Sequence, residues 1–203
     1  MNPMSEVMKG VTDLPLALLA VAFGLLLRKK EKNGWATLFF LVAAAALMGA
    51  AVHIIRIRKP YLQLLWVILY ALLFESVRRF SLLTVTHISD CPTEEQTAVW
   101  AAEAVLYLGS VLLLFLADGR DIYLFVVFMV VMFCRIVVCL IRYGFRPAKV
   151  TGLISLLLVP IVLQALAALI PFAVVAEHMI LAVAQVVTYA IGKNERSREL
   201  ISV

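Results

Sequence analysis

Ionisable residues lie within apolar stretches of this 203-residue chain, and the side chains of six of them are the ones that could do chemistry. They are His53, Glu75, Glu103, Arg135, Glu177 and His178. A charge in hydrocarbon costs at least roughly 2.5–3.5 kcal/mol, so each of these groups must be paired, hydrated or functional. Imidazole and carboxylate groups can bind a metal, carry protons or orient a substrate.

Seven apolar stretches position these residues. Hydrophobic residues make up 64% of the chain and the mean hydropathy is +1.03, whereas a soluble domain is about 45–50% apolar. A spanning helix needs about 20 apolar residues. We therefore predict an all-α, polytopic membrane protein, a seven-helix bundle forming one domain over residues 1–203. The expected spans are 13–28, 36–55, 61–83, 97–117, 122–142, 150–170 and 172–191.

Basic residues are placed mainly at the ends of these spans, which favours a membrane topology signal over nucleic-acid binding. With the N-terminus outside, twelve of the 18 Lys and Arg residues fall on the cytoplasmic side and five outside. The cluster Arg56-Ile57-Arg58-Lys59 is the outer exception. We predict a cell-membrane protein with its C-terminus in the cytoplasm. The twelve are Arg28, Lys29, Lys30, Lys32, Arg78, Arg79, Arg142, Arg146, Lys149, Lys193, Arg196 and Arg198.

Local signals divide the chain further. Residues 150–191 are almost continuously apolar, and Pro171 is the natural break between the last two spans, with Pro160 predicting a kink. Thr93, with Gln96 three residues later, predicts a helix start. Small residues crowd the second span, which predicts close packing of that span against its neighbours.

One polar cluster is expected near the outer side. Counting helical rise places His53 about 26 Å up the second span and His178 roughly 10 Å below the outer face. Asp13 and Glu177 share that level, and Gln185 lies on the same face of the last helix as His178. A histidine near the interface can also be solvated and ordinary. These five residues are the predicted outer polar cluster.

A second cluster is expected toward the cytoplasm. Glu103 and Arg135 lie at equal depth on antiparallel spans, which predicts a buried ion pair, and Glu75 lies at a similar level. Such a pair can be purely structural because its charges neutralise each other. A proton or ion pathway is the alternative.

The sequence lacks the motifs on which several kinds of enzyme or cofactor chemistry depend. The sequence has no Walker motif, no GxSxG and no HExxH. The middle of the last span has no lysine for a retinal Schiff base. His53 and His178 could hold at most a single haem between them.

The spans and two histidines resemble the superfamily of alkaline ceramidases and adiponectin-receptor-type membrane hydrolases. Those proteins have seven spans, N-outside, with a histidine late in the second span and an HxxxH pair in the seventh. His53 matches the first of these histidines and His178 the second. The resemblance implies a zinc site for amide hydrolysis, with zinc on His53 and His178 if a metal is bound.

Other positions depart from that family's pattern. The serine four residues before the second-span histidine is Gly49 here, and the second histidine of the last span is Ala182. The acidic residue would have to be Asp13 or Glu177, because Glu75 lies too deep. The resemblance therefore covers the topology and two motif residues, and is compatible with a divergent member that lacks the metal.

Three functions remain open, and the sequence leaves open whether the chain is an enzyme. The first is a metal-dependent lipid amidohydrolase. The second is a small transporter or substrate-binding module with an outer site and an inner gate or proton relay. The third is a sensory or assembly protein. The expected partners are membrane lipids and, through the charged tail Lys193 to Glu199, another protein.

Overall fold

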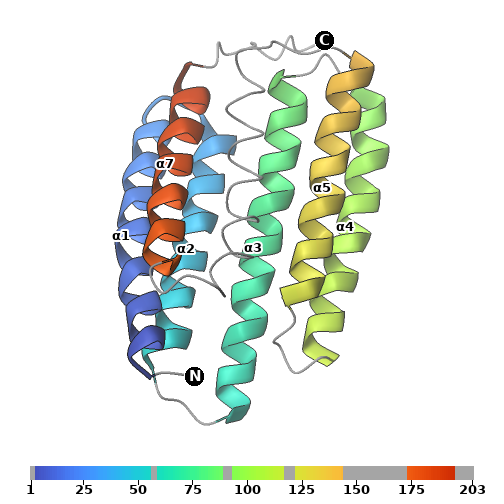
Figure 1. Cartoon of the computed structure of the whole chain (residues 1–203). Helices are drawn as coiled ribbons and strands as arrows, with labels where there is room; N and C mark the ends of the chain where they lie inside the picture. Colours follow the sequence, from blue (N-terminus) through green and yellow to red (C-terminus); the bar gives the residue numbers. More distant parts are fainter. Residues whose placement is uncertain (1–2, 56–58, 89–92, 117–121, 144–172, 195–203) are drawn as a thin grey trace.

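The computed structural model describes residues 3–55, 59–88, 93–116, 122–143 and 173–194 of the chain. Within these residues the structure is helical and contains no strand. The helices form a bundle whose long axes are nearly parallel (Figure 1). They are α1 (Pro3–Arg28), α2 (Asn33–Ile54), α3 (Lys59–Ile88), α4 (Thr93–Leu116), α5 (Ile122–Tyr143) and α7 (Ala173–Asn194).

The apolar helices support the predicted membrane class. Three helices are each long and apolar enough to cross a membrane within the described residues: Val7–Arg28, Asn33–Ile54 and Tyr61–Val85. The apolar parts of α4, α5 and α7 are shorter within the described residues. The start of α4 at Thr93 confirms the predicted helix start. The predicted span 150–170, with its kink and the break after it, lies outside the described residues.

The helices gather into two groups that meet where α2 packs against α3. The most extensive contact joins α1 to α2, and α7 packs against α1. On the other side, α4 and α5 pack against α3 (Figure 1). We call α1, α2 and α7 the N-terminal group and α3, α4 and α5 the central group. Each predicted polar cluster has its main contacts in one of these groups.

The α1–α2 contact is close because glycine and alanine line it. A Cβ atom added at Gly10 would lie 2.5 Å from Cγ1 of Ile54 and 3.0 Å from the backbone oxygen of Ala50. A Cβ at Gly24 would lie 2.8 Å from the ring of Phe40. In α2 itself the small residues Ala43, Ala45, Gly49 and Ala50 are buried, as predicted for a surface that lets helices pack closely.

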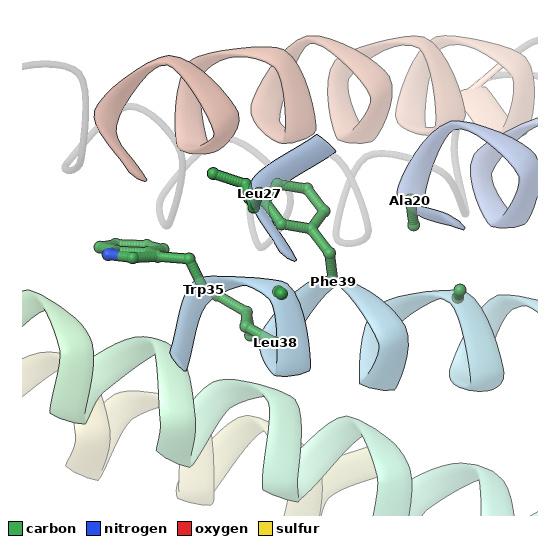
Figure 2. Packing of buried hydrophobic residues seen from close by; sticks show 7 residues of the cluster. Ala20, Leu27, Trp35, Leu38 and Phe39 are labelled. Atoms are coloured by element: carbon green, nitrogen blue, oxygen red, sulfur yellow. The ribbon is translucent and has the colours of Figure 1, made fainter. Parts of the chain in front are cut away.

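Aromatic side chains fill the other end of the N-terminal group. Figure 2 shows Leu27 of α1 beside Trp35 and Phe39 of α2, all of them buried. Phe23 stacks on Tyr189 of α7 with ring centroids 4.4 Å apart. A Cβ added at Gly192 would lie 3.0 Å from the Trp35 indole. These contacts fix the rotation of α7 against α1 and α2, and hence the direction in which its polar residues point.

The third helix extends further than its apolar span. The sequence predicts a span over 61–83, with Arg78 and Arg79 at its cytoplasmic end, whereas α3 continues to Ile88. Both arginines form ion pairs within the helix, and Arg78 is buried. Backbone hydrogen bonding carries the helix past the apolar run, and the cytoplasmic side of the two arginines stays a prediction.

Candidate functional site

The N-terminal group contains a carboxylate–imidazole pair that joins α1 to α7. Nε2 of His178 lies 3.0 Å from Oδ1 of Asp13, across 165 residues of sequence. The side chains are 14% and 16% exposed. With an ionised carboxylate, which can only accept, the donor in this hydrogen bond is the Nε2–H group of His178. The structure thus brings together two of the five residues predicted for the outer cluster.

The position of Asp13 depends on a glycine in α2. A Cβ added at Gly49 would lie 2.6 Å from Oδ2 of Asp13 and 3.2 Å from its Cγ. The carboxylate therefore lies against the backbone of α2, in space that any larger residue at position 49 would need. Sequence reasoning treated Gly49 only as a small packing residue and as the position of a missing serine. Its spacing gave no sign that a carboxylate from α1 lies there.

Gln185 extends the polar seam between α1 and α7. Its Nε2 donates to the backbone oxygen of Leu16 at 3.4 Å, and the residue is buried. Its Oε1 has no hydrogen-bond partner among the described residues. Gln185 lies seven residues after His178, and both contact α1, as the predicted shared face requires. Polar atoms therefore follow the seam for more than one helical turn.

The structure describes the side chain of only one of the other two ionisable residues of the predicted outer cluster, His53 and Glu177. The His53 ring packs edge-on against the Trp66 indole of α3, with ring centroids 5.5 Å apart. His53 thus contacts α3, whereas His178 contacts α1. The side chain of Glu177 lies outside the described part of the structure. A shared site for the two histidines stays a prediction.

A metal site requires at least three ligands in one place. Among the described residues, no group of three or more His, Cys, Asp or Glu side chains is arranged to hold a metal ion. Asp13 and His178 supply one oxygen and one nitrogen, whereas a catalytic zinc site usually has three protein ligands. A zinc ion on His53 and His178, which the resemblance implies only if a metal is bound, stays untested.

The central group contains the second polar cluster. Arg135 of α5 forms an ion pair with Glu103 of α4, and its Nη1 also donates to Oγ of Ser81 in α3 at 3.4 Å. The Glu103 side chain is 4% exposed and that of Arg135 10%. The pairing predicted from equal depth in antiparallel helices is confirmed.

Glu75 has partners that sequence reasoning missed. Nε and Nη2 of Arg78 donate to its two carboxylate oxygens at 2.7 and 2.8 Å. Nε of Arg79 donates to Oε1 at 3.0 Å. The i, i+3 and i, i+4 spacing of Glu75 with the two arginines carries this signal, because such residues are neighbours on a helix surface.

The two ion-pair groups form one network across three helices. The Arg78 guanidinium interacts electrostatically with Glu103 as well as with Glu75. Tyr107 of α4 lies within range of the charges of Glu75 and Arg78. We call Glu75, Arg78, Arg79, Glu103 and Arg135 the central network. It links α3 to both α4 and α5.

A family model matches residues 8–193, a range that includes Asp13, His178 and the whole central network. It is described as a family of unknown function, DUF6962. The chain belongs to DUF6962. Comparisons with curated proteins and with solved structures give no match. Membership in DUF6962 therefore assigns no activity, and it does not connect the chain to ceramidase-type hydrolases.

Proposed function

We propose that this DUF6962 chain is a multi-pass membrane protein that binds a small ligand at the Asp13–His178 pair. The observation that carries the proposal is the 3.0 Å contact between a carboxylate and an imidazole inside an apolar bundle. Ionisable groups within membrane segments are costly and mark ligand or proton pathways by default. Gly49 leaves the space that the carboxylate occupies, and Gln185 adds an acceptor deeper in the same seam.

The helix directions support seven spans with the N-terminus outside. In Figure 1, α5 ends at the end of the bundle opposite to the start of α7. We propose that the apolar stretch 150–170, which lies outside the described residues, supplies the crossing that this arrangement requires. Four exposed basic residues lie at the end of α7 and at or just beyond the end of α1: Arg28, Lys29, Lys30 and Lys193. By the positive-inside rule, this side of the bundle is the cytoplasmic side. The Asp13–His178 pair, near the other ends of these helices, then lies toward the outside.

Reporter fusions test this topology. A reporter that is active only in the cytoplasm should be active when fused after Val203 and inactive when fused before Met1. The physical reason is the excess of basic residues at the end of the bundle where α7 ends. The reverse pattern would place Asp13 toward the cytoplasm and contradict the proposed orientation.

Thermal melting in detergent tests ligand binding. A panel of small amines, alcohols and carboxylic acids should contain a compound that raises the melting temperature of the wild type. A ligand at one hundred times its Kd raises it by roughly 5–10 °C for a chain of this size. Asp13→Asn and His178→Gln should abolish the rise, because each removes one member of the pair.

Leu18→Ala is the matched control, because Leu18 lies on the exposed face of α1. It should leave the ligand response unchanged. His53→Gln tests separately whether the imidazole beside Trp66 belongs to the same site. If every compound shifts the wild type and Asp13→Asn equally, the pair only holds α1 to α7 and the sensory or assembly role is favoured.

Transport is the second candidate, and the two separate polar groups favour it. The Asp13–His178 pair lies in the N-terminal group, and the central network joins α3, α4 and α5. An outer site and an inner gate or proton relay need two such places. A stabilising compound from the melting panel should then accumulate in proteoliposomes containing the wild type and not Asp13→Asn. Binding without uptake would restrict the chain to a binding role.

Metal analysis separates these proposals from a hydrolase. Protein purified in detergent without added metal should carry well under one zinc per chain, because Gly49 and Ala182 stand where the resemblance expects a serine and a histidine. Two protein ligands leave a tetrahedral site half empty. Stoichiometric zinc that is lost in both His53→Ala and His178→Ala would overturn this expectation and favour lipid amide hydrolysis.

A further inference from the structure

The turn between α1 and α2 has a fixed backbone geometry. The backbone N–H group of Lys32 donates to the oxygen of Leu27 at 3.0 Å. The N–H group of Glu31 donates to the oxygen of Arg28, also at 3.0 Å, and Glu31 has a φ of 60°, in the left-handed region. Together these features make a Schellman motif, which ends a helix while it satisfies the last carbonyl groups. The turn therefore holds its side chains on a short, hydrogen-bonded backbone.

Basic side chains gather at this turn and at the end of α7 beside it. The exposed ones are Arg28, Lys29, Lys30 and Lys193. The two places meet because a Cβ atom added at Gly192 would lie 3.0 Å from Cγ of Trp35, near the start of α2. Glu31 is the only acidic residue between Arg28 and Trp35 in the sequence. Positive charge therefore exceeds negative charge at this turn.

An exposed apolar stripe leads to a lysine on each of the two helices, α1 and α7, that pack against each other (Figure 1). On one face of α1 the successive exposed residues are Val11, Leu14, Leu18, Ala22, Leu25 and finally Lys29. On one face of α7 they are Met179, Val183, Val186, Ala190 and finally Lys193. Steps of three and four residues keep each series on one side of its helix. Both apolar stripes thus end in a positive charge at the same end of the bundle.

We propose that the α1–α2 turn and the end of α7 bind the headgroup of an anionic phospholipid, with its acyl chains along the two apolar stripes. Ammonium and guanidinium groups donate strong, charge-assisted hydrogen bonds to phosphate oxygens. Clusters of four or more basic residues beside a membrane helix attract anionic headgroups. The apolar stripes favour a lipid over a free phosphate, because only a lipid has chains to cover them.

Thermal melting of the full chain in mixed micelles tests this proposal. Dioleoyl phosphatidylglycerol is added to the protein in an uncharged detergent, and dioleoyl phosphatidylcholine, which has the same acyl chains, is the lipid control. The melting temperature should rise to a plateau with phosphatidylglycerol, and half-effect should need about tenfold more phosphatidylcholine. Micelles have no inner or outer leaflet, and the assay contains no ligand for Asp13 and His178. The result is therefore independent of the proposed function.

The double variant Lys29→Gln, Lys193→Gln is the decisive one. Both side chains are exposed, so their replacement opens no buried cavity. The phosphatidylglycerol fraction at half-effect should rise about fivefold for each lysine removed, as expected for one basic residue near an anionic surface. The double variant Lys29→Arg, Lys193→Arg is the matched control. It keeps both charges at the same positions and should respond like the wild type.

Glu31→Gln gives a prediction of opposite sign. It removes the negative charge of the turn and keeps the shape of the side chain, so half-effect should occur at a lower phosphatidylglycerol fraction than in the wild type. An equal response to phosphatidylglycerol and phosphatidylcholine would overturn the proposal. An equal response of the wild type and the double glutamine variant to phosphatidylglycerol would also overturn it. So would an equal rise with glycerol 3-phosphate, because the site would then take a free phosphate.

Discussion

Replacing Arg135 by methionine is expected to lower the free energy of unfolding by about 3–5 kcal/mol. The reason is the carboxylate left behind. Glu103 is 4% exposed, and Arg135 is its ion-pair partner from α5. Without that guanidinium, Glu103 must be buried as an uncompensated charge or take up a proton. Reversible denaturation in mixed micelles, followed by the loss of helix signal, measures the difference.

A double-mutant cycle separates the pair from the two single losses. Glu103→Leu combined with Arg135→Met should cost much less than the sum of the single changes, because an apolar pair leaves no charge unmatched. Val138→Ala is the control on the same helix, since Val138 is exposed on α5. Its effect should stay within about 0.5 kcal/mol. Additive losses for Glu103 and Arg135 would show that their contact contributes little.

The ion pair between Glu103 and Arg135 could be predicted from the sequence because few structural features decide whether these two residues meet. Glu103 and Arg135 are the charged residues in the interior of two consecutive apolar stretches, and consecutive spans run antiparallel. Counting residues from the connecting segments then gives their depth. Rotation of the helices matters less, because a carboxylate and an arginine can reach each other over several ångströms. The structure agrees with that count.

The contact between Asp13 and His178 could be predicted from the sequence only in part. The sequence predicts that both residues lie at one level, but His53 and Glu177 lie at that level too. Choosing among them requires the order of helices around the bundle and the rotation of α7. Those depend on packing between distant segments, such as Phe23 against Tyr189 and Gly192 against Trp35. No local pattern encodes these contacts.

The end of α3 and the ion pairs of Arg78 and Arg79 show a different limit of prediction from hydropathy. Hydropathy marks the part of a helix that suits hydrocarbon, whereas backbone hydrogen bonds decide where the helix ends. For α3 the two differ, because the helix continues to Ile88. Charges that look like the end of a span can then lie inside the helix and pair with Glu75.

Replacing Gly49 by alanine is expected to disrupt the Asp13–His178 pair without touching either residue. The added Cβ would lie 2.6 Å from Oδ2 of Asp13, so the carboxylate has to move. That carboxylate is also the acceptor for Nε2 of His178. The expected loss is about 1–3 kcal/mol of unfolding free energy, as for other overpacked sites. Any ligand that stabilises the wild type through this pair should also lose its effect.

Two further variants assign the Gly49→Ala effect to Asp13. The atoms that the new methyl group would meet belong to the carboxylate, so Asp13→Ala removes them and the double variant should lose less than the sum of the single changes. Gly109→Ala is the control, because an added Cβ at Gly109 meets nothing within 4 Å. It should be neutral or stabilise α4 by up to about 1 kcal/mol. If Gly49→Ala behaves like Gly109→Ala, the Asp13 carboxylate does not depend on the gap at Gly49, and the proposed site loses the contact that fixes its position.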